Sequence, residues 1–467
     1  MFVGRKRELE TLGQAWTSGT FQMAVVYGRR RVGKTTLLTK FAEDKHTLWF
    51  TAQQQSDQGN LADFSVRIAE FFSLPAGTSF SSWSAALEFI AARQREERFL
   101  FVFDEFPYAA EAEGSLPSRF QVAVDHMLSN TGAVVVLCGS NQGFMESEVL
   151  GERSPLHGRR TLQLHLAPLG YLDAARMLPG TSPQEAMAYY GCVGGVPYYL
   201  AQINPRQNLR DNLGRLFFST DGLLYEEPGM LLRQELRETA LYSSVLRAMG
   251  SGATRSSQIA DRSGVAATSL PSYLRTLESL GIVGRSVPFG EPLSSKKGLW
   301  RLQDACWDFW YTFVMPTVQD IEAGAGELVA HNIPDAVLST YLGRRFEEAC
   351  REWLVTEALA GRLPFPAASF GSWWGTDPSA HEQADIDVVA GERYSRRALV
   401  GECKWRTSPN EAGAIETLRH RATLLSGWNV SDYYLFTREP ASEGTRRAAE
   451  SDPSLHLVDV EEMCRER

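Results

Sequence analysis

The chain has 467 residues and a net charge of −9, with 43% hydrophobic and 22% charged side chains. This composition is typical of globular proteins and excludes a disordered chain. The length predicts several domains, because one domain usually takes about 100–200 residues. The acidic balance excludes a uniformly basic nucleic-acid coat protein, while a local basic surface stays open.

No segment approaches the ~18 continuous apolar residues of a membrane span, and the N-terminus lacks the apolar region of a secretory signal. The six cysteines are scattered without a C-x-x-C pair, which argues against a zinc site and a disulfide framework. These features predict a reduced, cytoplasmic protein without a membrane partner.

Short apolar runs alternate with helical patterns over the first third of the chain. The runs are 23–27, 48–52, 99–103, 133–138 and 161–166. Continuous apolar strands separated by helices are typical of a parallel sheet that is covered on both faces. We therefore predict an α/β core over residues 1–168.

A phosphate-binding loop follows the first apolar run. Gly28–Thr35 fits the pattern G-x-x-x-x-G-K-[ST] and opens a helical segment. Backbone N–H groups between the glycines surround phosphate oxygens, Lys34 reaches the β- and γ-phosphates, and the Thr35 hydroxyl ligates Mg²⁺. The sequence predicts a site for ATP with Mg²⁺ formed by Gly28, Arg29, Arg30, Arg31, Val32, Gly33, Lys34, Thr35 and Thr36.

Two carboxylates follow the apolar run 99–103. Asp104 is placed to hold Mg²⁺, directly or through water, and Glu105 to polarise the attacking water as a general base. A strand that ends in Asp-Glu is common by itself. After a phosphate loop at this distance it predicts catalytic carboxylates.

Two more polar side chains are candidates for contact with the nucleotide, and for each an ordinary structural role is an equal alternative. Ser140, after the run 133–138, would contact the γ-phosphate or the water, or it belongs to a plain turn. Arg159 would neutralise the transferring charge as an arginine finger, in cis or from a neighbouring subunit of a homo-oligomer. The alternative for Arg159 is a surface arginine pair with Arg160.

Several segments resemble the archaeal-type ATPase family, within the STAND branch of AAA+-related P-loop NTPases. They are Phe2–Arg5 with Glu8-Leu9, Tyr27–Thr35, Phe103–Phe106, Ser154–Arg159 and Gly194–Leu200. The resemblance implies that Gly4 and Arg5 lie near the adenine. It also implies that the turn with Pro197 belongs to a helical lid, residues 169–235, that senses the nucleotide. His157 departs slightly from the family pattern, where an aromatic residue is more usual.

The sequence pattern of residues 236–305 predicts a winged helix. Two short helices, 256–262 and 268–280, are joined by a turn with Gly264 and followed by a β-hairpin whose wing tip is 294–298. Residues 255–301 carry seven basic and three acidic side chains, in contrast to the acidic whole. Two interpretations stay open: contact with DNA phosphates, or packing within the protein.

A connecting helical segment, 306–340, precedes an α/β region at 341–467 with a second acidic constellation. Asp387 lies on one predicted strand, and Glu402 and Lys404 share a face of the next. Asp387 and Glu402 would hold Mg²⁺ or Mn²⁺, and Lys404 would orient water or stabilise charge at phosphorus. Glu347 is a further acidic ligand or supports the ligands. An exposed charge pair is the alternative.

The same region resembles the DUF234 domain. The matching segments are 309–314, 343–347, 371–375 and the two strands with Asp387 and Glu402. The resemblance implies a nuclease-like domain of the PD-(D/E)xK type. The alternative is a retained fold that binds nucleic acid without cutting it, or that only supports the ATPase.

These patterns together predict a multidomain α/β protein with a P-loop core, a helical lid, a winged helix and a nuclease-like domain. The leading hypothesis is an ATPase that acts on DNA through the winged helix and a metal-dependent nuclease-like domain. The second hypothesis is a non-nucleolytic switch, in which ATP regulates partner binding or oligomerisation.

Overall fold

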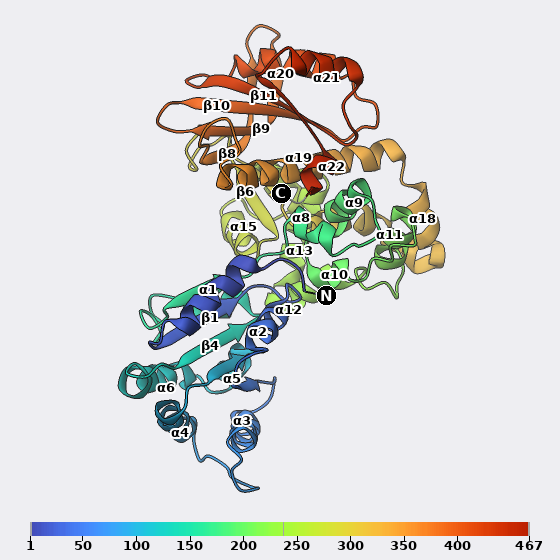
Figure 1. Ribbon diagram of the computed structural model, residues 1–467. Helices are drawn as coiled ribbons and strands as arrows, with labels where there is room; N and C mark the ends of the chain where they lie inside the picture. The colour runs from blue at the N-terminus through green and yellow to red at the C-terminus, as the bar shows by residue number, and fades with distance from the viewer. Residues whose placement is uncertain (1, 237, 466–467) are drawn as a thin grey trace. The chain divides into compact units, whose positions relative to one another are not determined.

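The computed structural model describes residues 2–236 and 238–465 of the chain. They form two compact units that divide between Pro168 and Leu169 (Figure 1). In the described part of the chain, no helix combines the length and the apolar character needed to cross a membrane.

The first unit contains a parallel five-stranded sheet in the order β2-β3-β4-β1-β5. Its strands are β1 (Gln22–Tyr27), β2 (Thr47–Thr51), β3 (Leu100–Asp104), β4 (Val134–Gly139) and β5 (Leu162–His165). Side chains on both faces of the central strands are buried: Ala24 and Val26 pack on one face, Met23 and Val25 on the other. The predicted parallel α/β sheet is therefore confirmed.

Helices cover both faces of this sheet. They are α1 (Lys6–Thr17), α2 (Lys34–Ala42), α3 (Asp57–Phe71), α4 (Trp83–Glu96), α5 (Phe106–Ala112), α6 (Leu116–Ala123), η1 (Val124–Leu128), α7 (Gln142–Phe144) and η2 (Met145–Val149). Leu12 of α1 and Leu37 of α2 pack on one face. Phe64, Trp83 and Phe120 pack on the other, which is rich in aromatic rings. Because helices cover both faces of the sheet, the ends of the strands are the place left for polar side chains.

The second unit begins with helices and continues into a helix-turn-helix with a hairpin. Its helical region holds α8 (Tyr171–Arg176), α9 (Pro183–Val193), α10 (Pro197–Leu200), α11 (Leu209–Phe217) and α12 (Glu227–Glu235). Next come α13 (Thr239–Gly250), α14 (Ser256–Ser263), α15 (Leu270–Ser279), β6 (Val283–Ser286) and β7 (Leu299–Leu302). Strands β6 and β7 pair antiparallel, as expected for a winged helix.

The rest of the second unit is a helical connection and a mixed five-stranded sheet, in the order β12-β11-β10-β9-β8. The connection holds α16 (Ala305–Phe309), η3 (Trp310–Val314), η4 (Met315–Thr317), α17 (Val318–Asp320), η5 (Ile321–Ala325) and α18 (Gly326–Asn332). The sheet region holds α19 (Asp335–Leu359), β8 (Ser369–Asp377), β9 (Glu382–Glu392), β10 (Arg397–Lys404), α20 (Glu411–Ala422), β11 (Asn429–Thr437), α21 (Glu443–Glu450), β12 (Leu455–Asp459) and α22 (Val460–Cys464). The domain boundaries predicted inside this unit stay predictions.

The wing between β6 and β7 packs against the C-terminal sheet. The Phe289 N–H donates to the Ser372 carbonyl of β8 at 2.8 Å. The Phe289 ring is buried in a cluster with Val389 and Leu418, and its centroid is 4.8 Å from the Trp428 ring. This part of the predicted winged helix therefore packs within the protein.

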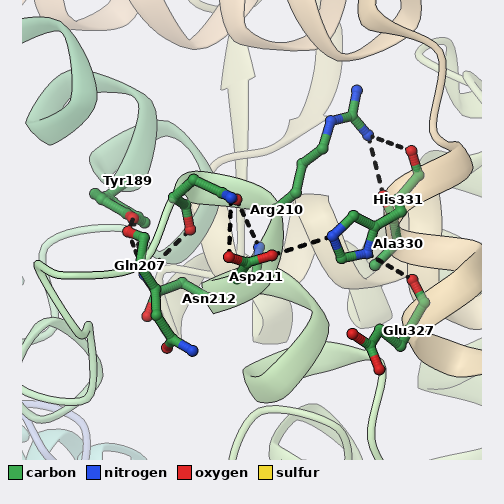
Figure 2. Close-up of polar contacts among 9 residues, drawn as sticks. Tyr189, Gln207, Arg210, Asp211, Asn212, Glu327, Ala330 and His331 are labelled. Carbon is green, nitrogen blue, oxygen red and sulfur yellow. Dashed lines mark hydrogen bonds and ion pairs between the residues drawn. The ribbon is translucent and has the colours of Figure 1, made fainter.

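Helices α11 and α18 are joined side by side through polar contacts (Figure 2). Arg210 donates to the carbonyls of Ala330 and His331 at 3.1 and 3.0 Å, and the His331 ring lies 3.1 Å from Asp211. The hydrogen bond with the Glu327 carbonyl, and then the one with Asp211, raise the pKa of His331. These contacts lie at the exposed edge of the helix pair.

The next residue along α11, Asn212, is fully buried. Its amide donates to the Tyr189 hydroxyl at 2.9 Å and to the Gln207 carbonyl at 3.2 Å (Figure 2), and its carbonyl oxygen accepts from the Asn204 N–H at 2.8 Å. One side chain thus satisfies buried backbone and hydroxyl groups from three places in the chain.

Replacing Asn212 by alanine is expected to destabilise the second unit by about 1–3 kcal/mol, because buried polar partners lose their hydrogen bonds. Calorimetric melting of the full-length protein measures the shift. His331→Ala in the same helix pair is the matched control and should change the melting little, because an exposed ion pair contributes little. Equal shifts for both variants would contradict the buried-network explanation.

Candidate functional sites

The loop between β1 and α2 has the backbone shape of a phosphate cradle. Gly28, Arg31 and Gly33 have φ angles of 144°, 71° and 93°. A Cβ at Gly28 would lie 2.4 Å from the Leu166 carbonyl oxygen, so only glycine fits there. Val32 is buried and anchors the loop, while Thr36 is exposed in the first turn of α2. Alternating backbone conformations of this kind turn successive N–H groups toward one point.

Lys34 lies across this loop and is only 6% exposed. Its Nζ donates to the carbonyls of Gly28 and Arg29 at 2.8 and 2.9 Å. Burial lowers the pKa of Lys34. The Lys34 ammonium is thus held at the phosphate loop by neutral carbonyl groups, which phosphate oxygens can replace as partners.

The two predicted carboxylates lie at the end of β3. Thr35 donates its hydroxyl to Asp104 Oδ2 at 3.0 Å, which brings both predicted magnesium ligands together. Glu105 has a left-handed backbone, with a φ of 51°. Its carboxylate accepts from the Ser140 hydroxyl at 2.7 Å and from the Ser140 N–H at 3.2 Å. Ser140 at the end of the adjacent β4 therefore fixes Glu105.

The N-terminal segment is tied to the same loop. Gly4 and Arg5 both have positive φ angles, 69° and 61°. Arg5 donates to the carbonyls of Val32 and Ala167 at 3.1 and 2.6 Å. The guanidinium thus joins the N-terminus to the loop and to the chain after β5. The predicted contact of Gly4 and Arg5 with adenine stays a prediction.

Two of the other residues predicted to contact the nucleotide, Arg30 and Arg159, have hydrogen-bond partners within the first unit. Arg30 donates to the Tyr108 hydroxyl at 2.5 Å. Arg159 makes a bidentate pair with Asp125, both bonds being 2.8 Å long, and also donates to backbone carbonyls. Pro197 opens α10 in the second unit. The finger role of Arg159 and the lid role of Pro197 stay predictions.

A second polar cluster lies where β9 and β10 pair. Asp387 Oδ2 accepts from the Cys403 N–H at 2.8 Å, which joins Asp387 to β10 between Glu402 and Lys404. Lys404 Nζ donates to Glu402 Oε1 at 2.5 Å. Glu402 is 5% exposed, and its Oε2 is buried without a hydrogen-bond partner. Arg421 Nη1 lies 3.9 Å from that oxygen.

The carboxylates of this cluster disfavour one another's charge. Burial raises the pKa of Asp387, and the charge of Glu402 raises it further. Burial also raises the pKa of Glu347 on α19, and the charge of Asp387 adds to this. Buried like charges of this kind are relieved by a cation.

The donor set suits a magnesium-like ion bound by two carboxylates. Among residues 2–236 and 238–465, no three histidine, cysteine or carboxylate side chains are arranged as a metal-ligand group. Magnesium commonly uses only one or two carboxylates and takes its other ligands from water and phosphate. Asp387 and Glu402, whose Oε2 has no hydrogen-bond partner, fit that pattern. Glu347 as a third ligand stays a prediction.

The sequence analysis counted Arg301 only as a basic residue of the winged helix and did not connect Arg301 or Arg351 to this cluster. The positive charges of Arg301 on β7 and Arg351 on α19 act on Glu347. Arg351 follows Glu347 by four residues on one helix, a spacing that places both on one face and could have pointed to it. Arg301 lies distant in sequence, and no local pattern connects it to Glu347.

The phosphate loop, Lys34 and the two carboxylates lie at the carboxyl ends of parallel strands. This arrangement is typical of P-loop nucleotide-binding proteins. The first unit belongs to that class. Residues 2–203 match the model of a family described as an ATPase domain predominantly from Archaea. Residues 310–415 match DUF234, described as archaeal and bacterial proteins of unknown function. The chain therefore joins an archaeal-type ATPase domain to a DUF234 domain, as the resemblance implied.

Two relatives and one solved structure are similar to this chain. An uncharacterized protein of Methanocaldococcus jannaschii is 29% identical over 406 residues, 87% of this chain and 88% of its own length. An uncharacterized ATP-binding protein of the same organism is 53% identical over 45 residues, 10% of this chain and 76% of its own. The structure of a Walker-type ATPase of Pyrococcus abyssi superposes with a TM-score of 0.50 and 17% identity, covering 66% of this chain and 96% of that one. This last likeness concerns the fold alone.

Proposed function

We propose that this protein hydrolyses ATP with Mg²⁺ at the phosphate loop and that its second unit binds DNA and cleaves it with a divalent metal. One observation carries the nuclease part: Glu402 Oε2 is buried beside Asp387 and Lys404 without a hydrogen-bond partner, and its ion pair with Arg421 is long, at 3.9 Å. A buried, unpaired carboxylate oxygen is costly unless a ligand completes its contacts.

At the phosphate loop, Lys34 exchanges its two carbonyl partners for the β- and γ-phosphate oxygens. Thr35 and Asp104, already 3.0 Å apart, hold Mg²⁺, which offsets the phosphate charge when bound. Glu105 orients the attacking water and accepts its proton. Ser140 positions Glu105 for this task through its hydroxyl and its N–H.

At the second cluster, Asp387 and Glu402 hold the divalent metal, which supplies a Lewis acid beside the scissile phosphate. Lys404 turns its ammonium from Glu402 Oε1 toward the charge that develops on the phosphate oxygens. The Cys403 N–H holds Asp387 in place through its hydrogen bond. These residues bind, orient and neutralise a phosphodiester.

A second candidate is an ATP-dependent switch that does not cut DNA. Lys404 already neutralises one oxygen of Glu402 at 2.5 Å, and Phe289 of the wing is buried against the sheet. Both observations also suit a scaffold whose charges are satisfied internally. In this function, ATP controls partner binding or self-association.

The test is a cleavage assay on the full-length protein with labelled duplex and single-stranded DNA. Reactions contain Mg²⁺, Mn²⁺ or EDTA, each with ATP, ADP, a non-hydrolysable ATP analogue or no nucleotide. We expect cleavage only with a divalent metal, at a rate that depends on the nucleotide. Intact DNA in every condition, together with ATP turnover, favours the non-nucleolytic switch.

A further inference from the structure

Arg301 lies on the exposed side of the winged-helix hairpin. Its neighbours Trp300 and Leu302 are buried, 9% and 5% exposed, whereas the Arg301 side chain is exposed. This alternation follows the two-residue period of a strand, which sends side chains of odd and even positions to opposite faces. Strand β7 thus presents one cation outward.

A buried arginine fixes this strand to α19. The guanidinium of Arg345 donates to the carbonyls of Leu302 and Gln303 at 3.4 and 2.9 Å, and it pairs with Glu348 at 3.1 Å. Arg345 is 8% exposed. Because Leu302 is the residue after Arg301, this attachment holds Arg301 beside the segment of α19 that carries Glu347.

Arg351 lies one helical turn beyond Glu347 on the same face of α19. Its Nε is buried and has no hydrogen-bond partner. In the part of the chain that the structure describes, neither Arg351 nor Arg301 forms a hydrogen bond or an ion pair within 4.0 Å. Their charges nevertheless reach Glu347 and oppose the burial that raises its pKa.

Two arginines from different elements therefore act on Glu347 without forming an ion pair with it. A planar guanidinium matches two oxygens of a phosphate, and pairs with phosphate are stronger than those with neutral groups. We propose that Arg301 of β7 and Arg351 of α19 form a phosphate clamp, which holds a nucleic-acid backbone beside the cluster of Glu347, Asp387 and Glu402. This inference rests on the proposed function for its substrate class, and it assigns the winged-helix hairpin a part in that site.

The clamp is tested by DNA binding, which is independent of cleavage. Full-length protein is titrated into a short labelled DNA duplex in EDTA over a range of KCl concentrations, with fluorescence anisotropy as the readout. Arg301→Ala and Arg351→Ala should each weaken binding to any sequence and lower the slope of log affinity against log salt by about one. The double variant should lose on the order of tenfold in affinity or more.

Arg446→Ala is the matched control, because this exposed arginine lies on α21, which packs on the far edge strand β12. It should leave both affinity and slope unchanged. Arg351→Lys should restore part of the salt slope, because it keeps the charge but not the planar fork. If Arg351→Ala fails to fold, Arg301→Ala carries the test, since its side chain is exposed.

The clamp is disproved if the double variant binds DNA with the affinity and salt slope of the unaltered protein. It is also disproved if the unaltered protein binds no DNA. The nuclease assignment fails differently: the arginine variants weaken DNA binding, yet the unaltered protein cleaves nothing with any metal. If cleavage occurs, the clamp predicts a raised KM for the double variant with kcat much less affected.

Discussion

Lys34→Ala is expected to reduce ATP turnover by at least about 10²-fold, as losses of one charge-stabilising donor commonly do. The Lys34 ammonium is buried at the cradle, and its present partners are two loop carbonyls. In the alanine variant, the β- and γ-phosphates lose this ammonium. Phosphate release from ATP, measured at saturating Mg²⁺, reports the loss.

Lys40→Ala provides the control on the same helix. Lys40 pairs with Glu43 at the surface, and its side chain is 45% exposed. Its removal should leave turnover near that of the unaltered protein. Normal turnover in Lys34→Ala would show that the loop is not the hydrolytic site, whereas loss in both variants would indicate damage to α2.

Asp387→Ala and Lys404→Ala should each lower metal-dependent DNA cleavage by about 10²–10³-fold, for different reasons. Asp387→Ala removes one of the two proposed ligands, so calorimetry should also show weaker Mn²⁺ binding. Lys404→Ala removes the ammonium but keeps both carboxylates, so Mn²⁺ should still bind. The pair of measurements separates loss of the metal from loss of charge stabilisation.

Glu416→Gln is a control for this series, because Glu416 is an exposed carboxylate on α20. It should change neither cleavage nor metal binding. Full cleavage by Asp387→Ala would disprove the assignment of the site, and unchanged Mn²⁺ binding in that variant would place the metal elsewhere.

The phosphate loop could be predicted from sequence because its determinants are local. Gly28 and Gly33 allow the backbone angles, and the apolar run before them makes the strand. The contact of Ser140 with Glu105 depends instead on β3 and β4 lying side by side, an order that the sequence pattern does not contain. The pairing of Arg159 with Asp125 is equally non-local.

The C-terminal cluster shows the same division. Glu402 and Lys404 share a face because strand geometry demands it, and this was predicted. Glu402 Oε2 lacks a hydrogen-bond partner because of the packing around it. The position of Arg301 near Glu347 depends on the attachment of β7 to α19. Packing of Phe289 against Trp428 joins positions far apart in the chain, which periodicity alone does not reveal.

The docking of Phe289 attaches the C-terminal sheet to the hairpin before it. Strand β8 is the last strand on its side of the sheet, and the Phe289 N–H is bonded to it. A fragment excised at residues 310–415 would lose this residue together with β11 and β12. It would expose raw strand edges, which promote aggregation. A stable fragment of this region would therefore have to keep the hairpin β6–β7 as well as β11 and β12.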